Sequence, residues 1–246
     1  MSDGPVVGIV GAADGAIRSA VEAAGGRPES GEATAVARDS DYVVAVGEPA
    51  LLAVARAGPR GPVLPVGAGP GVGSAPGDGG PAAVERLLAG EFDREDHPIL
   101  EVRVADRTRA RVLMDAMLVT ASPGEISEYA AHADGTLLSR FRADGVVVAT
   151  PAGSAGYARR AGGPVVQPGA GVATVVPVGP FATDASHWVV ASSTLSLSVE
   201  RDETPVSLLA DDRVVGSVHP QERVRLVSGE PITVAVVPGH TPRFDV

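Results

Sequence analysis

The spacing of apolar residues changes near Pro98, and this change constrains the fold more than any other feature of the sequence. Before it, short apolar runs alternate with segments of helical spacing. Residues 5–10 (Pro-Val-Val-Gly-Ile-Val) predict a strand, and residues 14–25 predict a helix with apolar positions three and four residues apart. A second strand at 41–46 leads into a helix at 50–57. This alternation indicates an α/β layer built on a parallel sheet.

After Pro98 the apolar residues alternate with polar ones, as they do in half-buried strands. Asp134-Gly135 lies between two such runs and predicts a type I′ hairpin turn, in which both central residues take a positive φ. Further strands are expected at residues 99–104, 172–178, 188–199, 204–209, 213–218, 222–227 and 231–237. We therefore predict an α/β domain over residues 1–95 and an all-β, sandwich-like domain over residues 96–246. The extreme C-terminus is free to pack back on the first domain.

The charge balance bears on the partners of the chain. There are 30 acidic and 20 basic side chains, the basic ones are all arginine, and the formal net charge is −10. We expect no nucleic-acid partner, because neutralising phosphates requires a basic patch. The acidic, lysine-free composition indicates a halophilic protein, since high salt screens self-repulsion. A GC-rich genome that favours arginine codons is the alternative explanation.

The absence of cysteine excludes disulfides, thiolate metal ligands and a cysteine nucleophile. The five histidines are scattered without the spacing of metal ligands, so we expect no metal site. No apolar run reaches the roughly 20 residues that cross a bilayer, and the acidic N-terminus does not resemble a signal peptide. A cytoplasmic location without a membrane partner is the resulting expectation.

One segment has the residue types of a small-molecule site. Asp144-Gly145 opens a strand-like run that ends at Thr150-Pro151, and a loop of small residues follows. This loop carries one hydroxyl, Ser154, and one aromatic ring, Tyr157. Glycine has no Cβ and lets a ligand approach the backbone closely. The hydroxyl and the ring add hydrogen bonding and stacking, although a plain turn into a helix fits the same residues.

This segment closely resembles the NAD kinase family, in which an Asp-Gly strand leads into Thr-Pro-Thr-Gly-Ser-Thr-Ala-Tyr and then Ala-Gly-Gly-Pro. The matching residues are Thr150, Pro151, Gly153, Ser154, Tyr157 and Ala161 to Pro164, and the departures are Ala152, Ala155 and Gly156. The resemblance implies that family's two-domain architecture, a small-molecule nucleotide ligand (NAD, NADP or a related adenine nucleotide) and a homo-oligomer formed through the β domain. It assigns the ligand site to Asp144, Thr150, Gly153, Ser154, Ala155, Gly156 and Tyr157.

The loop after the second strand departs from the family. There the family carries Gly-Gly-Asp-Gly-Thr, whose Asp is the general base acting on the ribose 2′-hydroxyl, whereas this chain has Val46-Gly-Glu-Pro-Ala50. Glu48 is one methylene longer and lies next to a rigid proline. A misplacement of about 1 Å can lower a rate by on the order of 100-fold. Glu48 is therefore either a replacement catalytic base or an acid that favours the N-terminal dipole of the following helix.

The Asn-Glu motif of the family is also missing. It follows an Ala-Leu pair, and here Ala116-Met117 is followed by Leu118-Val119, which offer no polar group. The favoured hypothesis is a nucleotide-binding pseudoenzyme with lost or weak kinase activity that acts as a sensor or regulatory partner. One alternative is an active NAD kinase that uses Glu48, Mg²⁺ and ATP or polyphosphate to make NADP. The other is a noncatalytic structural subunit of an oligomer.

Overall fold

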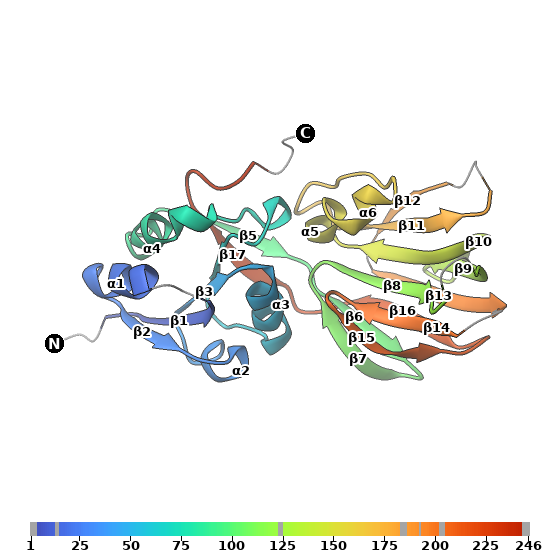
Figure 1. The fold of residues 1–246 in the computed structure, drawn as a ribbon, viewed down its shortest axis with the longest axis horizontal. Coiled ribbons are helices and arrows are strands. Elements are labelled where there is room, and N and C mark those ends of the chain that lie inside the picture. Colours follow the sequence, from blue (N-terminus) through green and yellow to red (C-terminus); the bar gives the residue numbers. More distant parts are fainter. Residues whose placement is uncertain are drawn as a thin grey trace. The chain divides into compact units, whose positions relative to one another are not determined.

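The computed structural model describes residues 4–12, 15–122, 125–182, 186–191, 193–201 and 205–242. Residues 14 and 204, at which two of the predicted segments begin, lie outside these ranges, as do the first three residues of the acidic N-terminus. The chain forms two compact units, each with its own sheet (Figure 1). The first unit contains the residues up to His97 and those from Pro231 onward, and the second contains Pro98–Glu230.

The first unit is built on a six-stranded sheet with the order β2-β1-β3-β4-β17-β5. All neighbouring strands run parallel except β17 and β5, which are antiparallel. The strands are β1 (Val6–Gly11), β2 (Arg27–Ser30), β3 (Tyr42–Val46), β4 (Val63–Val66), β5 (Asp93–His97) and β17 (Ile232–Val236). This confirms the predicted α/β class with a parallel sheet.

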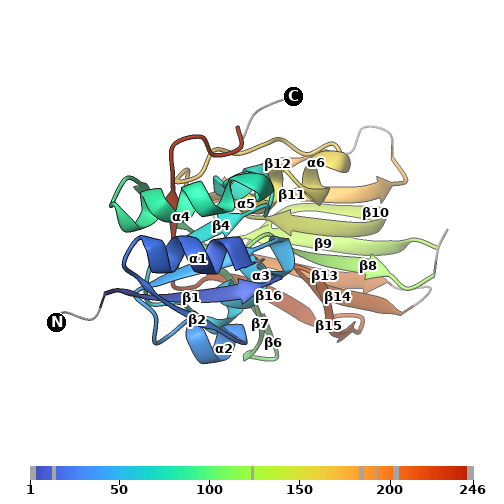
Figure 2. The same cartoon turned by 60° about the vertical axis from the view of Figure 1, so that its left-hand side comes forward.

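Helices cover both faces of this sheet. On one face, α1 (Gly15–Ala23) and α4 (Gly80–Leu88) lie side by side (Figures 1 and 2) and pack onto the buried strand residues Val44 and Leu64. The other face carries α2 (Ala33–Val36) and α3 (Glu48–Ala57). Neither of these helices contributes a residue to the apolar cluster that contains Val44 and Leu64. Two short 3₁₀ turns, η1 (Pro70–Val72) and η2 (Gly77–Gly79), lie between β4 and α4.

β17 differs from its sequence-based expectation. The alternating pattern at 231–237 assigns this strand to the second domain, but it lies between β4 and β5 in the first sheet. Ile232 and Val234 are buried there. Alternation identifies the apolar face of a strand but not the sheet that the strand joins. The pattern therefore could not reveal that the chain returns to the first sheet at β17. The first continuous stretch of the first unit ends at His97, whereas the expected boundary was at residue 95.

The described residues of the second unit form an antiparallel sheet of eleven strands. Along its main path the order is β15-β14-β8-β10-β9-β13-β16-β6-β7, and β11 pairs with β10 and β12. The strands are β6 (Leu100–Val104), β7 (Arg107–Val112), β8 (Asp115–Thr120), β9 (Ser127–Ala133), β10 (Thr136–Ala149), β11 (Val172–Pro180), β12 (Trp188–Ala191), β13 (Thr194–Arg201), β14 (Val206–Ala210), β15 (Arg213–Val218) and β16 (Arg223–Ser228).

This sheet curls around a main apolar core, to which the fully buried Leu118, Tyr129 and Leu226 belong, and a smaller apolar cluster includes Met117, Val147 and Ala158. The predicted sandwich-like β architecture is therefore confirmed, with two single-turn helices added after β10. The predicted hairpin turn is confirmed as well, because Asp134 and Gly135 have φ values of 46° and 79° between β9 and β10. Within the described part of the chain, no helix is long and apolar enough to span a bilayer.

Candidate functional site

Six of the predicted site residues lie in one turn that follows β10, and Asp144 lies within β10 itself. This turn comprises residues 150–157 and is called the glycine turn below. It contains Thr150, the one-turn helix α5 (Pro151–Ser154), a two-residue link and the first residue of α6 (Tyr157–Arg160). The second unit thus places six of these residues just after the end of a single central strand, and Asp144 five residues before that end.

Thr150 attaches the glycine turn to the backbone just before β8. Its hydroxyl donates to the carbonyl oxygen of Leu113 at 2.6 Å and accepts from the Gly153 amide at 3.3 Å. Its own amide donates to the carbonyl oxygen of Met114 at 2.9 Å. The side chain is 1% exposed. The hydroxyl therefore acts as a helix N-cap and as an anchor within the fold.

Ser154 attaches the other end of α5 to the chain that follows. Its buried hydroxyl donates to the Pro151 carbonyl oxygen at 2.7 Å and accepts from the Val166 amide at 2.9 Å. The amides of Ser154 and Gly156 also donate inside the turn, to the carbonyl oxygens of Thr150 and Gly153. These hydroxyls and amides hold the shape of the turn. The sequence motif had suggested that they face a ligand.

Gly153 is needed for close packing of the glycine turn. A Cβ built on this residue would lie 2.1 Å from the carbonyl oxygen of Met114 and 2.5 Å from its carbonyl carbon. The bare backbone of the turn therefore rests directly on the peptide that Thr150 also contacts. Of the remaining turn residues, Ala155 and Gly156 are half-buried and Tyr157 is 40% exposed. The Tyr157 ring is the aromatic surface that the turn presents to solvent.

Asp144 is half-buried between β8 and β11. A Cβ built on Gly179 would lie 2.4 Å from Oδ2 of Asp144, so the carboxylate rests against the bare backbone of Gly179, which has a φ of 56°. The carbonyl oxygen of Asp144 accepts from the Thr120 hydroxyl at 3.1 Å and from the Tyr129 hydroxyl at 3.4 Å. The residue is thus fixed by its backbone and by Gly179, while its carboxylate stays able to accept further hydrogen bonds.

The fully buried phenol beside Asp144 has a shifted proton affinity. Burial raises the pKa of Tyr129 from 10.0 to about 12; the Ser127 hydroxyl opposes this rise and the charge of Asp144 adds to it. Between these two values the unfolded chain loses the Tyr129 proton while the folded chain keeps it. The unfolded state then binds fewer protons, so raising the pH favours unfolding.

We therefore expect the free energy of unfolding of the second unit to fall by roughly 2 to 3 kcal/mol between pH 10 and pH 12. The Tyr129→Phe variant should lack this contribution to the pH dependence. Urea titrations of both proteins across this window measure it, since other titrating groups are common to the two. Parallel curves for the two proteins would contradict the expectation.

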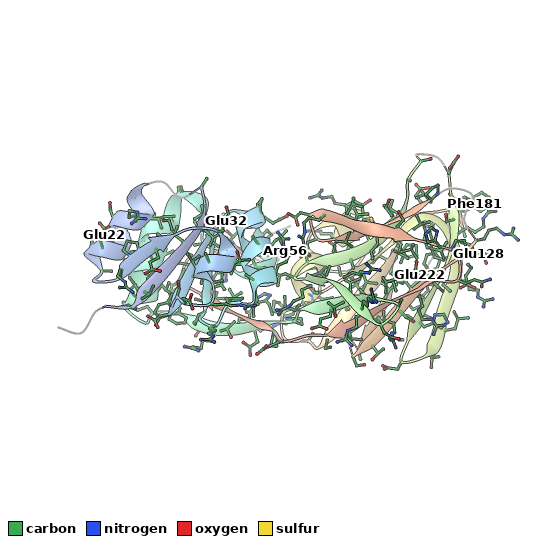
Figure 3. The ribbon with its side chains drawn as sticks, turned by 90° about the horizontal axis from the view of Figure 1, so that it is seen from below. Glu22, Glu32, Arg56, Glu128, Phe181 and Glu222 are labelled. Carbon is green, nitrogen blue, oxygen red and sulfur yellow. The ribbon has the colours of Figure 1, made fainter. Side chains whose placement is uncertain are left out.

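A hollow of about 420 Å³ opens in the same unit, and its lining on β10 ends at Arg142, two residues before Asp144. The Phe141 and Trp188 rings in its lining stack at 6.0 Å between centroids with an interplanar angle of 22°. The Arg142 guanidinium lies 5.8 Å from the centroid of Phe181, a ring that is 73% exposed. Figure 3 labels Phe181 at this end of the unit. Arg142 precedes Asp144 by two residues on β10, so both side chains belong to the same face of the strand.

Glu48 belongs to the first unit, whereas the other predicted site residues belong to the second. Gly47, with a φ of 87°, follows β3 and precedes α3, and its amide donates to the Val66 carbonyl oxygen at 2.8 Å. Glu48 is exposed and starts α3, with Pro49 in the first turn. A Cβ built on Gly69 would lie 4.0 Å from Oε2 of Glu48. The carboxylate therefore reaches toward the loop that follows β4, at the carboxyl end of the parallel strands.

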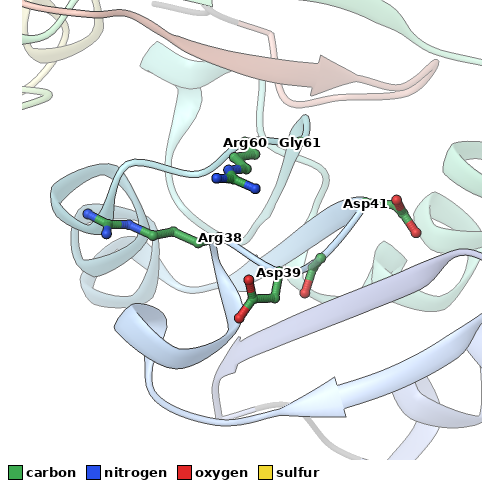
Figure 4. A pocket seen from close by; sticks show the side chains of 6 residues that line it. Arg38, Asp39, Asp41, Arg60 and Gly61 are labelled. Carbon is green, nitrogen blue, oxygen red and sulfur yellow. The ribbon is translucent and has the colours of Figure 1, made fainter.

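A second hollow, of about 430 Å³, lies at the opposite end of the same strands. Its lining includes Ser40 and Asp41, which precede β3, and Gly61, which precedes β4. In Figure 4 the Arg38 side chain extends away from Arg60. Parallel sheets bind ligands outside the carboxyl ends of their strands, so this hollow does not belong to the candidate site. Among the described residues, no three His, Asp or Glu side chains come together in a group that could hold a metal ion.

Sequence reasoning missed several residues around Asp144. Trp188 reads as the start of a strand, and nothing in the sequence marks Gly179, Phe141 or Tyr129 as residues of a site. No local pattern marks them, because their proximity comes from the pairing of β10 with β9 and β11 and of β11 with β12. Only a three-dimensional arrangement of these strands identifies them.

The fold and the glycine turn define a class of two-domain proteins, in which a parallel α/β unit is joined to an antiparallel β unit that carries a Thr-Pro-x-Gly-Ser turn. Residues 113–237, just over half of the chain, match the family model of the ATP-NAD kinase C-terminal domain. The chain therefore belongs to the NAD kinase family.

Known proteins agree with this assignment. The NAD kinase of Methanopyrus kandleri is 36% identical over 109 residues, which cover 44% of this chain and only 40% of that protein. An NAD kinase from Archaeoglobus fulgidus, solved in complex with ATP, superimposes with a TM-score of 0.78 at 22% identity and covers 93% of this chain and 92% of that chain. Yeast NADH kinase complexed with NADH gives a TM-score of 0.78 at 16% identity, over 97% and 85% of the two chains. At these identities the two structures establish the fold alone.

Proposed function

We propose that this protein binds NAD, NADP or a related adenine nucleotide through Asp144, together with the glycine turn and the aromatic hollow that lie toward the two ends of β10, and that its kinase activity is lost or weak. The observation that carries the proposal is the contrast around Asp144. The Asp144 carboxylate rests against Gly179, and a hollow lined by Arg142, Phe181 and Trp188 lies farther along the same two strands, while the neighbouring strand β8 offers Leu118-Val119. Binding groups are retained where groups for chemistry are missing.

The ligand class follows from the chemistry of the retained groups. The Asp144 carboxylate can accept from an adenine amine or a ribose hydroxyl, and Tyr157 offers a face for stacking. The aromatic hollow has a volume within the range of small-molecule sites, about 300 to 1,000 Å³, and Arg142 adds a cation for an anionic group. The named ligands of the two similar structures, ATP and NADH, belong to the same chemical class.

Weak or absent kinase chemistry is supported by two positions. Leu118, aligned with the Asn of the family motif, is fully buried in the core of the second unit, and Val119 packs partly buried against Met117 and Val147. In the first unit, Glu48 replaces the family's Asp and is followed by a proline within the first helical turn. A general base must lie within hydrogen-bonding reach of the proton it removes, and the longer side chain changes that reach.

Binding can be measured through Trp188, the single tryptophan of the chain, which lines the hollow. Titration with NAD⁺, NADP⁺ or ATP is expected to change its fluorescence, and calorimetry gives the dissociation constant for the same nucleotide. The absence of any response to all three would contradict the proposal and leave the structural-subunit alternative.

Kinase activity is measured as NADP formation from NAD⁺ with Mg²⁺ and either ATP or polyphosphate. We expect the rate to be at most slightly above that of a reaction without protein, and to be unchanged in the Glu48→Ala variant. A rate that is clearly higher for the unmodified chain and falls in Glu48→Ala would instead establish an active NAD kinase with Glu48 as base. Glu85, an exposed acid within α4, provides a matched control as Glu85→Ala.

We further propose that the protein is cytoplasmic and adapted to high salt, and that it has a sensor or regulatory role. We also propose that it forms a homo-oligomer through its second unit. The exposed apolar side chains Phe181 and Val189, 73% and 51% exposed, support an interface on that unit. Sedimentation of the unmodified chain and of a Val189→Glu variant tests it. A monomer at every protein and salt concentration would rule it out.

A further inference from the structure

We propose that Asp211 positions the glycine turn by holding three backbone amides of residues 113–115, the segment against which that turn packs. Asp211 lies in the tight turn between β14 and β15, with a φ of 49°. The sequence alone identifies it as a hairpin-turn aspartate. The role proposed here concerns the ligand site and so rests on the proposed function, but the contacts that carry it lie entirely within the second unit.

One carboxylate receives three consecutive amides. Oδ1 of Asp211 accepts from Met114 at 2.8 Å and from Asp115 at 3.2 Å, and Oδ2 accepts from Leu113 at 3.1 Å. The Asp211 amide in turn donates to the Asp115 carbonyl oxygen at 2.8 Å. Successive amides that converge on one anion form a nest, and hydrogen bonds to a charged acceptor are the stronger kind. The orientation of residues 113–115 is therefore set from the β14–β15 turn.

The other side of the same peptides holds the glycine turn. The carbonyl oxygen of Leu113 accepts from the Thr150 hydroxyl, and that of Met114 accepts from the Thr150 amide. Gly153 lies directly against Met114, with no room for a Cβ. An amide that donates to an anion polarises its peptide group, and hydrogen-bonded groups in series strengthen one another. Asp211 thus acts on the turn through two peptide groups and does not touch it.

Holding the three amides requires both acceptor oxygens of the Asp211 carboxylate. In Asp211→Asn, one of the two acceptor oxygens becomes an NH₂ group that faces an amide donor, so at least one amide of the nest loses its partner. Asp134 provides a matched control, because it also occupies a hairpin turn of the second unit with a similar φ of 46°. Its carboxylate accepts from the Ser193 hydroxyl and receives no backbone amide of the 113–115 segment.

Amide hydrogen exchange tests the positioning role without a ligand. In Asp211→Asn, the amides of Thr150, Gly153 and Ser154 should exchange about 10- to 100-fold faster than in the unmodified chain, as expected for the loss of a hydrogen bond to a charged group. The amides of Ala130 and Leu197, in strands β9 and β13, serve as internal references. In Asp134→Asn the glycine turn should exchange at its normal rate.

Nucleotide affinity links the turn to the site. With NADP⁺ as the probe and Trp188 fluorescence as the readout, Asp211→Asn should bind about 10-fold or more weakly than Asp134→Asn at a temperature where both are fully folded. Unchanged exchange in the glycine turn overturns the positioning role, whatever the affinity. Faster exchange with unchanged affinity overturns its link to the ligand. If the unmodified chain itself does not bind, the proposed function fails, and exchange alone decides whether Asp211 holds the turn.

Discussion

Replacing Gly153 with alanine is expected to lower the unfolding midpoint of the second unit by roughly 6 to 12 °C. The added Cβ would lie 2.1 Å from the Met114 carbonyl oxygen, far inside van der Waals contact. Both groups belong to the backbone, so neither can rotate away as a side chain would. Overpacking of this kind costs about 3 kcal/mol or more when the surroundings cannot relax.

The reason that relaxation is difficult lies in the hydrogen bonds around the contact. Met114 is fixed by the Asp211 carboxylate on one side and by the Thr150 amide on the other. Moving the glycine turn outward would stretch the 2.6 Å bond from the Thr150 hydroxyl to Leu113. The substitution therefore either strains the packed arrangement or breaks a buried anchor.

Thermal unfolding followed by circular dichroism measures the effect, and Gly77→Ala serves as the control. Gly77 does not have a positive φ, and an added Cβ there would meet nothing within 4 Å. That control variant should change the free energy of unfolding by no more than about 0.5 kcal/mol. If Gly153→Ala unfolds at the same temperature as the unmodified chain, then the turn can move off Met114 and the packing argument is wrong.

The fold class was accessible from sequence because it depends on local patterns. Apolar spacing distinguishes helices from strands, and the Asp134-Gly135 pair specifies its turn through the φ values that it tolerates. Local patterns did not predict β2 or α2. The sequence of β2, Arg-Pro-Glu-Ser, shows no apolar alternation, and α2 has only four residues, too few to show a helical spacing. β17 was placed in the wrong sheet because pairing partners are chosen by the whole chain.

The location of the candidate site was also accessible, but the orientation of its groups was not. The motif predicted a loop of small residues after a strand-like run, and residues 150–157 form a compact turn there, which contains α5 and begins α6. Thr150 and Ser154 nevertheless point their hydroxyls inward, toward Leu113 and Val166. Those partners lie 37 and 12 residues away in the sequence. A motif lists the groups that a turn contains, whereas its tertiary partners decide which of them remain available to a ligand.

Asp144 and Gly179 lead to the prediction with the largest effect on binding. In Gly179→Ala, the new Cβ would lie 2.4 Å from Oδ2 and 2.9 Å from Cγ of Asp144, so the carboxylate must turn away from its present position. If that carboxylate binds the nucleotide, affinity for NADP⁺ should fall about 10- to 100-fold, as for the loss of a hydrogen bond to a charged group. Calorimetry measures this loss.

Backbone strain must be separated from the displacement of the carboxylate, and Gly169 makes this possible. Gly179 and Gly169 both have positive φ values, 56° and 78°, so an alanine at either position costs about 1 to 2 kcal/mol in the left-handed conformation. A Cβ on Gly169 would meet nothing within 4 Å. Gly169→Ala should therefore lose similar stability and keep its affinity for NADP⁺.

A double-mutant cycle with Asp144→Ala completes the argument. If Gly179→Ala weakens binding only by displacing the carboxylate, the variant that combines both changes should bind no more weakly than Asp144→Ala alone. Additive losses would mean that Gly179 contributes to the site through its own backbone. Equal affinity of Gly179→Ala and Gly169→Ala would mean that the Asp144 carboxylate does not bind the nucleotide, and that the ligand lies elsewhere on the second unit or on the first.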